Sequence, residues 1–434
     1  MKGILHNRWV RIQGVATVLY IFAQIDKANV AVAFPGIRTD LGLTSGVIGF
    51  AVGMFAWGYL VFQIPVGRLT SAWSAKGTIL VLCAAWSITS ASTALVQTET
   101  QFIINRFVLG ISEGGILPAV VVVMRAWFTQ QERARANLAL LGTPIALMIG
   151  NALCGFAVSY VGWRWMFVVT AVPSLLWCFV WWWAIEDDPR DATWLDGATK
   201  QKLVAALDAE AKHAPVAQGH WLGAIWHPTV LILALYNLLG LTALWGLTFW
   251  LPSLIVEEGR AIGTAGFLSA IPYAVSIVMT CIISASSDRM QERRWHLIVP
   301  TILAGACMGV AGFFGESHIM FLLICISLSF GLWFGRITVY WIMVADAVPK
   351  GAAGPAMAIA NGVGNLGGFI GPWMFGLLRG ESGGFNTSMM VGGGLYIMAG
   401  VLALFVQMRP SNSPKRDAAP ELIRPVEASS APGR

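Results

Sequence analysis

The stretch FIINRFVLGISEGGILPAVVVVM, residues 102–124, decides the fold class. It is long and apolar enough to cross a bilayer, because a membrane-spanning helix needs about 20 residues. It nevertheless contains Arg106 and Glu113, whose spacing is close to two helical turns and therefore puts both on one helix face. A charge in hydrocarbon costs roughly 2.5–3.5 kcal/mol or more. A span that keeps both signs is expected to use them, most simply in a pathway for ions or substrate across a membrane.

A second apolar run, residues 12–37, carries Asp26 and Lys27 near its middle. Adjacent helical residues point about 100° apart, so both side chains cannot face one spot directly. We expect Asp26 to face Glu113 and Lys27 to reach a substrate carboxylate. The structural alternative has Lys27 extending toward the membrane surface and Asp26 capping a broken helix.

The composition describes an integral membrane protein. Of the 434 residues, 56% are hydrophobic and 12% are charged, with a mean hydropathy of +0.68, whereas soluble domains have about 25% charged residues. The net charge of +6 comes without a basic cluster of the nucleic-acid-binding kind, and the six cysteines lack metal-ligand spacing. No nucleophile–base pair and no nucleotide-binding loop is recognisable. We therefore expect no enzyme, no cofactor, no metal and no nucleic-acid partner, and we find no cleavable signal peptide.

The apolar runs predict an all-α protein with twelve transmembrane helices. They lie near residues 12–36, 46–67, 77–96, 101–124, 136–159, 163–185, 228–252, 262–285, 297–315, 319–345, 354–378 and 387–407. A polar stretch, residues 186–226, divides them into two six-helix halves, residues 1–185 and 227–408. Residues 409–434, rich in Pro, Ser and Ala, are expected to form a disordered tail.

Lysine and arginine residues set the predicted orientation. With both termini in the cytoplasm, 21 of the 28 basic residues lie on that side, four lie outside and three lie within spans. Cytoplasmic loops carry an excess of Lys and Arg, so this distribution favours cytoplasmic termini. Two halves around a central linker suggest a carrier whose halves rock about a midplane site.

Several short motifs recur at the predicted spans and loops. They are IDKANV (25–30), GY (58–59), QIP (63–65), NRFVLGISEGG (105–115), WF (127–128), ERARA (132–136), GWRWMF (162–167), SDR (287–289) and NGVGNLGGFIGP (361–372). Together they resemble the major facilitator superfamily and, within it, the anion:cation symporter family of organic anion, sugar acid and aromatic carboxylate transporters. The resemblance extends over almost the whole chain, from Arg8 to Arg409, and implies the major facilitator fold.

The sequence also departs from the family pattern. The first span usually carries Asp-Arg and here carries Asp26-Lys27, which removes the bidentate guanidinium. Ser71 stands where an acidic residue usually contributes to an inner gate, which leaves Asp288 and Arg289 as the expected gating residues. The glycine pattern typical of drug/proton antiporters is missing from the fifth span, which counts against efflux.

The resemblance implies roles for individual residues. Glu113 is the expected proton carrier, with Arg106 and Asp26 as its partners; the structural alternative is an ion pair between helices. For substrate binding we expect Lys27 with Tyr59, Trp341 and Asn361, although a packed aromatic ring or an interhelical amide would also explain the last three.

Arg336 lies outside the family pattern. It is either a second anion-binding cation across the cavity from Lys27, which would favour dianions, or a contact to lipid headgroups or an inner gate.

We therefore expect a proton-coupled secondary active transporter that imports a small organic anion, a carboxylate, by alternating access. The predicted protein is a monomer in the bacterial inner membrane. Two alternatives stay open: a proton-antiport exporter of organic anions or drugs, and a non-transporting membrane sensor. The sequence does not separate an aromatic or dicarboxylic acid from a sugar acid as the substrate.

Overall fold

The structure, a computed structural model, describes residues 7–137, 142–213, 226–314, 319–349, 352–379 and 384–406, and these are helical almost throughout. The predicted disordered tail lies outside the described residues. The first bundle contains η1 (Trp9–Gly14), α2 (Val15–Leu41), α3 (Ser45–Ala72), α4 (Ala75–Ser92), η2 (Thr93–Leu95), α5 (Glu99–Gly114), α6 (Ile116–Trp127), α7 (Gln130–Asn137) and α8 (Thr143–Ala184). The second contains α11 (Pro228–Glu257), α12 (Ile262–Leu268), α13 (Ile271–Met290), α14 (Arg294–Phe314), α15 (Ile319–Gly335), α16 (Ile337–Asp346), α17 (Ala353–Asn365), α18 (Gly367–Arg379) and α19 (Asn386–Ala403). Between them lie η4 (Pro189–Asp191) and α9 (Gly197–His213).

The prediction of an all-α protein with twelve membrane spans is confirmed. Among the described residues, 10 helical segments are long and apolar enough to cross a membrane. One of them, α8, has 42 residues and is two spans joined at Gly162, whose φ of 76° is readily adopted only by glycine. The remaining span consists of α17 and α18 in succession, each too short to cross alone.

Four spans are interrupted partway along their length, and one of these is the eighth, which breaks between α12 and α13 at Ser269 and Ala270. The fourth span breaks between α5 and α6 at Gly114 and Gly115, followed by Pro118, which has no backbone N–H to continue the helix. The tenth breaks between α15 and α16 at Arg336, and the eleventh breaks at Leu366 before two glycines. Broken helices expose backbone polar groups, so in a membrane they are found where protein or water surrounds them. The breaks therefore indicate the interior of the protein.

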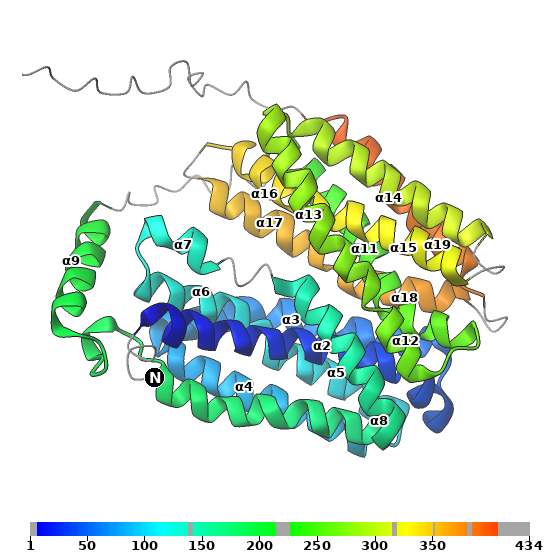
Figure 1. Cartoon of the computed structure of the whole chain (residues 1–434), viewed down its shortest axis with the longest axis horizontal. Helices are drawn as coiled ribbons and strands as arrows, with labels where there is room; N and C mark the ends of the chain where they lie inside the picture. Colours follow the sequence, from blue (N-terminus) through cyan, green and yellow to red (C-terminus); the bar gives the residue numbers. More distant parts are fainter. Residues whose placement is uncertain are drawn as a thin grey trace, which may run out of the picture.

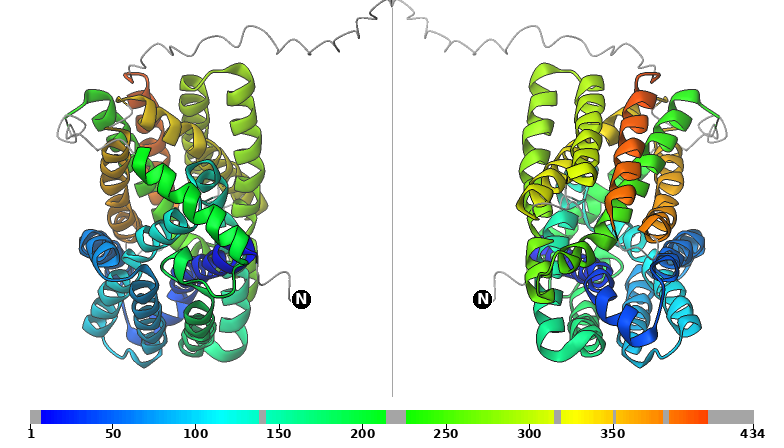
Figure 2. Two further views of the ribbon diagram at one scale, coloured as in Figure 1. Left: turned by 90° about the vertical axis from the view of Figure 1, so that its left-hand side faces the viewer. Right: turned by 90° about the vertical axis from the view of Figure 1, so that its right-hand side faces the viewer.

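The two bundles are arranged side by side, with α7 and α9 at one end of the molecule (Figure 1). We call this the linker end and the opposite one, with the turns at Gly42 and Gly259, the far end. Helix α9 is held against the first bundle, because Arg133 of α7 pairs with Glu210 of α9 at 2.6 Å. Side views show the two bundles stacked on each other with α9 along one end (Figure 2).

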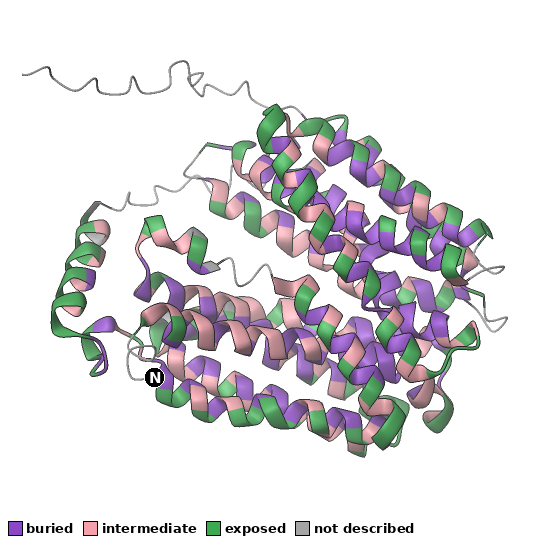
Figure 3. Ribbon diagram, viewed as in Figure 1, coloured by how far each residue is buried: buried purple, intermediate pink, exposed green. Residues whose placement is uncertain are grey.

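The bundles meet along two seams, one where α2 and α8 contact α11, α12 and α13, and the other between α3 and α18. Gly46, Gly49 and Gly53 form one face of α3 there, and a Cβ added at Gly49 would lie 2.3 Å from the Pro372 carbonyl oxygen. The second seam extends only to about Trp57, whose ring contacts that of Phe369. Beyond this point α3 packs within its own bundle, against α5. Buried residues accordingly concentrate where the bundles meet away from the linker end (Figure 3), and the halves diverge toward the linker end.

The close approach of α3 and α5 gives a test of the packing. A Cβ at Gly110 would lie 2.1 Å from the Phe55 carbonyl oxygen, whereas a Cβ at Gly309 of α14 would meet nothing within 4 Å. Overpacking costs about 1–3 kcal/mol, so Gly110→Ala should lower the Tm of the purified protein. Gly309→Ala is the matched control. It should leave the free energy of unfolding unchanged or raise it by at most about 1 kcal/mol, so the Tm should stay the same or rise slightly. Equal Tm values for the two variants would contradict this packing.

Candidate functional site

Four charged side chains from the first and fourth spans lie together in the first bundle. Asp26 and Lys27 come from the middle of α2, and Arg106 and Glu113 from α5, with Glu113 next to the break before α6. Asp26, Arg106 and Glu113 are buried, and Lys27 is partly buried. The structure thus brings together the four charges that the sequence singled out, and it places Lys27 next to Glu113.

Lys27, rather than Arg106, forms the ion pair with Glu113. The Lys27 Nζ lies 3.8 Å from Glu113 Oε2. The same ammonium group lies 4.9 Å from the centre of the Tyr59 ring and 5.9 Å from that of Phe55. Lys27 thus has one acid and two aromatic faces around it, and its partial exposure leaves it open to a further anion.

Asp26 is held by polar neighbours on one side only. Its Oδ1 accepts hydrogen bonds from Ser90 Oγ at 2.5 Å and from Asn29 Nδ2 at 2.8 Å. Its Oδ2 and both oxygens of Glu113 are buried and accept no hydrogen bond from the described residues. The two carboxyl groups interact with each other. A carboxylate only accepts hydrogen bonds and a carboxylic acid can also donate one, so a proton on either acid would supply a donor that the pair otherwise lacks.

Arg106 balances the carboxyl pair from the other side. Its Nη2 donates to Thr93 Oγ1 at 2.8 Å and to Asn105 Oδ1 at 3.0 Å. The guanidinium also interacts electrostatically with the carboxyl groups of Asp26 and Glu113. With all four groups ionised the cluster has no net charge. One added proton makes it positive by one, so proton binding favours the presence of an anion.

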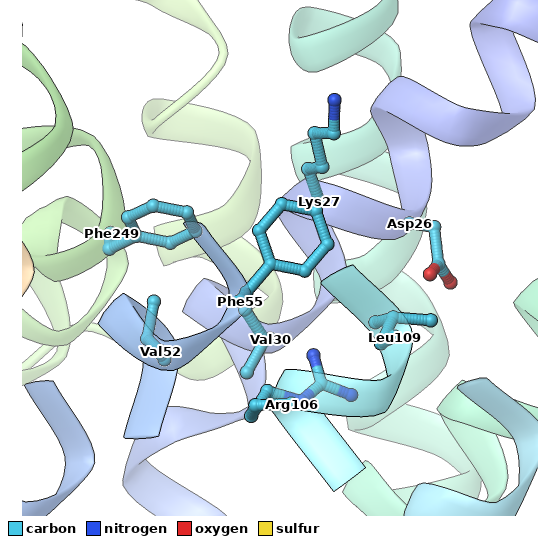
Figure 4. Close-up of a pocket in the computed structure, with 8 residues that line it drawn as sticks. All are labelled: Asp26, Lys27, Val30, Val52, Phe55, Arg106, Leu109 and Phe249. Carbon is cyan, nitrogen blue, oxygen red and sulfur yellow. The ribbon is translucent and has the colours of Figure 1, made fainter. Parts of the chain in front are cut away.

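Three of the four charged residues, Asp26, Lys27 and Arg106, line a pocket between the bundles, whereas Glu113 lies behind Lys27, outside the pocket wall. Its wall consists of Asp26, Lys27, Val30, Val52, Phe55, Arg106, Leu109 and Phe249. Phe249 belongs to α11 of the second bundle, and the rest belong to the first. Figure 4 shows Lys27 and Arg106 on opposite sides of Phe55, with Phe249 facing Phe55 from the second bundle. The pocket wall therefore combines three charged side chains with five apolar ones.

The other residues expected to bind substrate lie outside this pocket wall. Tyr59 is closest, through its ring contact with Lys27. Trp341 of α16 is partly buried, with its ring 4.9 Å from that of Tyr340. Asn361 of α17 is also partly buried, and its side chain forms no hydrogen bond with a described residue. Both residues belong to the second bundle, and the structure does not bring them into contact with the four charges.

Arg336 is enclosed inside the second bundle. It is 2% exposed, which is incompatible with the alternative of a lipid-headgroup contact. It also does not line the pocket, so it does not face Lys27 across it. An aromatic cage surrounds it, because the preceding turn and the facing helices supply large rings.

The expected gating residues lie at the linker end of α13. Asp288 pairs with Arg293 at 2.6 Å, within the second bundle, and Arg289 is exposed. Asp288 is thus paired with the neighbouring turn, whereas Arg289 lies on the surface.

Sequence reasoning missed a charged cluster at the far end that joins the bundles. Glu257 of α11 pairs with Arg379 of α18 and lies 3.9 Å from Arg38 of α2. Arg379 also donates to Ser45 Oγ at 2.8 Å. Arg38 and Arg379 were visible as two of the few basic residues outside, but nothing in the sequence indicated that they share one acid. Ser90 and Asn29 were missed because hydroxyl and amide groups in spans are too common to single out.

Comparison with known proteins agrees with this architecture. The family model described as the Major Facilitator Superfamily matches residues 16–372, and the chain belongs to this superfamily of membrane transporters. A protein of Agrobacterium vitis named "Putative tartrate transporter" is 30% identical over 423 residues, which is 95% of this chain and 92% of that protein. A "Quinolone resistance transporter" of Acinetobacter baumannii is 30% identical, covering 92% and 93%. The "Probable sulfoacetate transporter SauU" of Cupriavidus necator is 28% identical, covering 94% and 95%.

Solved structures share the fold at low sequence identity. A bacterial homologue of the human lysosomal transporter Spinster, in an inward-facing and occupied conformation, superposes with a TM-score of 0.76 at 16% identity, covering 92% of this chain and 97% of that one. The inward open xylose transporter XylE of E. coli gives 0.75 at 15% identity, with the same coverage. The predicted major facilitator fold is thereby confirmed.

The hydrogen bond from Ser90 to Asp26 generates a prediction. Hydrogen bonds to ionised acceptors contribute about 1.5–3 kcal/mol, against about 0.5–1.5 kcal/mol for neutral ones. Ser90→Ala should therefore lower the Tm, and the loss should be larger at a pH where Asp26 is ionised than at acid pH. Ser87→Ala is the matched control, because Ser87 donates only to the Cys83 carbonyl of its own helix. Identical losses for both variants at pH 5 and pH 7.5 would contradict a charged acceptor at Asp26.

Proposed function

We propose that this protein imports a small organic anion together with protons by alternating access. The observation that carries the proposal is the buried carboxyl pair of Asp26 and Glu113 between Lys27 and Arg106, at a pocket walled by both bundles. Relatives of the chain are named for tartrate and sulfoacetate, which are both organic anions. We further propose that the protein acts as a monomer, since one chain supplies both bundles.

The proposed orientation follows from the basic residues. Placing the linker end in the cytoplasm puts 21 of 28 Lys and Arg residues on that side. The location is then the bacterial inner membrane, with both termini cytoplasmic. The divergence of the bundles at the linker end corresponds, in this orientation, to an inward-facing state. The structural neighbours named as inward-facing support that assignment.

The proposed mechanism uses the charge balance of the cluster. In the outward-facing state a proton bound by Glu113 releases Lys27 from its ion pair, so that Lys27 can bind the carboxylate of the substrate. Tyr59 shields this contact, and Asn361 and Trp341 approach from the second bundle when the halves close. After the halves rock, Glu113 loses its proton to the cytoplasm and reclaims Lys27, which expels the anion. Arg106 and Asp26 keep the cluster neutral in this state.

Opening the far end requires separation of the charged cluster there. Arg38 lies in the first bundle and Glu257 and Arg379 in the second, so outward opening breaks the contacts of Arg38 with Glu257 and of Arg379 with Ser45. Asp288 and Arg289 are the corresponding candidates at the linker end, as the sequence suggested. We therefore assign outer-gate contacts to the Glu257 cluster.

Export is the second candidate function. It is favoured by the relative named for quinolone resistance, which is as similar overall as the tartrate relative. The two functions differ in the coupled proton movement when substrate enters a vesicle. A symporter carries protons inward with the substrate and acidifies the interior, whereas an antiporter carries protons outward and raises the interior pH.

Glu113→Gln tests proton coupling. The amide cannot exchange a proton, so the variant should retain exchange of bound substrate across the membrane but lose proton-driven accumulation. Each proton per substrate is equivalent to about tenfold accumulation per pH unit of gradient, and this factor should disappear in reconstituted vesicles. Glu99→Gln, at the exposed start of the same helix, is the control and should accumulate normally. Full gradient-driven accumulation by Glu113→Gln would exclude Glu113 as the proton carrier.

Glu257→Gln tests the outer gate. Removing the shared acid removes the ion pair of Glu257 with Arg38 across the bundles, and a partly exposed pair of this kind contributes about 0.2–1 kcal/mol to the closed form. The population with an open far end should therefore rise by up to about fivefold. Pulsed EPR between spin labels at the exposed residues Thr100 and Thr387 should show a longer distance component. Glu258→Gln, which removes the neighbouring acid, should leave the distribution unchanged; the same result for Glu257→Gln would remove the cluster from the gate.

A further inference from the structure

Arg336 is the buried charge that the proposed mechanism does not use. It follows α15 and begins α16, at the break of the tenth span. The fourth span is broken at a similar place between α5 and α6, where Glu113 lies. Each half thus carries a charge at the break of its fourth helix, an acid in the first half and a base in the second.

The faces of the Arg336 guanidinium are covered by aromatic rings. Its central carbon lies 3.4 Å from the centre of the Trp333 ring, 5.1 Å from that of Tyr236 and 5.3 Å from that of Tyr340. Stacked rings stabilise the cation through its faces. They do not satisfy the five N–H donors, which point outward in the guanidinium plane.

No described residue accepts a hydrogen bond from these donors. Arg336 has no carboxylate within ion-pair distance among the described residues, and its Nε is buried without a partner. Arg106, the comparable buried arginine of the first half, donates to Thr93 and Asn105 and faces two acids. A buried charge with unused donors is strongly unfavourable unless an anion compensates it.

Of the three tyrosine hydroxyl groups near Arg336, two donate hydrogen bonds to described residues and one does not. The Tyr340 hydroxyl donates to the Leu233 carbonyl at 3.2 Å. Thr301 donates to the Leu297 carbonyl, so the 2.5 Å contact between Tyr236 and Thr301 has the Tyr236 hydroxyl as its donor. The Tyr396 hydroxyl, by contrast, is buried and forms no hydrogen bond with a described residue, and the centre of its ring lies 4.7 Å from that of Trp333, the ring on which Arg336 stacks. Two unused donor groups are therefore enclosed in the same aromatic cage.

We propose that Arg336 and the Tyr396 hydroxyl form a second anion site, inside the second bundle, that binds one compact acidic group. A carboxylate or sulfonate suits a guanidinium edge through paired hydrogen bonds, and a halide ion offers the same charge. The acidic group comes either from a substrate with two acidic groups or from a separate inorganic anion. The first source rests on the proposed function, and the second does not.

Tartrate, threonate and chloride distinguish the sources. Tartrate and threonate share a four-carbon chain, and threonate has a CH2OH group where tartrate has its second carboxylate. The affinity of each probe is measured from the thermal stabilisation of purified protein in a low-chloride zwitterionic buffer, because a ligand that binds only the folded state raises the Tm. The variants are Arg336→Gln and the control Arg260→Gln, which removes the same charge from an exposed residue at the far end.

Two results support the site. If the substrate supplies the group, Arg336→Gln weakens tartrate binding by at least about tenfold, as for loss of a buried charge partner, and leaves threonate binding within about twofold of the wild type. If a free anion supplies it, chloride stabilises the wild type saturably, Arg336→Gln abolishes this response, and binding of both carboxylates is unchanged. Arg260→Gln behaves as the wild type in both cases.

Other results overturn it. A folded Arg336→Gln protein that matches the wild type for all three probes, or loses tartrate and threonate equally, makes the cage a packing element only. The same holds if the wild type responds to none of them. Should Arg336→Gln fail to fold, Tyr396→Phe provides the decision: it removes only the hydroxyl and should weaken the Arg336-dependent probe about threefold. Failure of the proposed function appears separately, as wild-type vesicles that do not accumulate a carboxylate under a proton gradient.

Discussion

The low polarity of the membrane interior is the constraint on which this structure depends. A charge placed there must be neutralised by a partner, by a proton or by a ligand. In the first bundle the constraint is met by Asp26, Lys27, Arg106 and Glu113, which cancel one another in a small volume. Such a balance is sensitive, because adding or removing one proton changes the charge of the whole cluster. In the proposed mechanism, the energetic cost that makes charges rare in spans is therefore what couples proton binding to anion binding.

Helix geometry places that cluster at the centre. The fourth span is interrupted next to Glu113, and the first span presents Asp26 and Lys27 on adjacent faces of an unbroken helix. Because adjacent helical residues point about 100° apart, Lys27 and Asp26 can approach Glu113 from two different sides. Gly58 and Gly110 allow α3 and α5 to approach closely beside it and bring Tyr59 toward Lys27.

Much of the fold was predictable from the sequence, and much of the site was not. Runs of about 20 apolar residues are a local property, so the twelve spans could be read directly, including the two that merge at Gly162. The charges at Asp26, Lys27, Arg106 and Glu113 stood out because they are rare in such runs. Their pairing did not, because the rotation of α2 relative to α5 depends on packing across the bundle. The acid shared by Arg38 and Arg379 joins residues more than 300 positions apart, and no local pattern encodes that contact.

The glycine face of α3 has a mechanical consequence. Gly46, Gly49 and Gly53 bring the backbone of α3 close to α18, and at Gly49 an added Cβ would meet backbone atoms of Pro372 and Trp373. This close approach lets the rings of Phe50 and Trp57 on α3 interlock with those of Phe369 and Trp373 on α18. Helices that interlock through bulky side chains must change rotamers before they separate, and each change adds a barrier. The rate at which this face opens would then be limited by its aromatic rings as well as by the charged residues at the end of the seam.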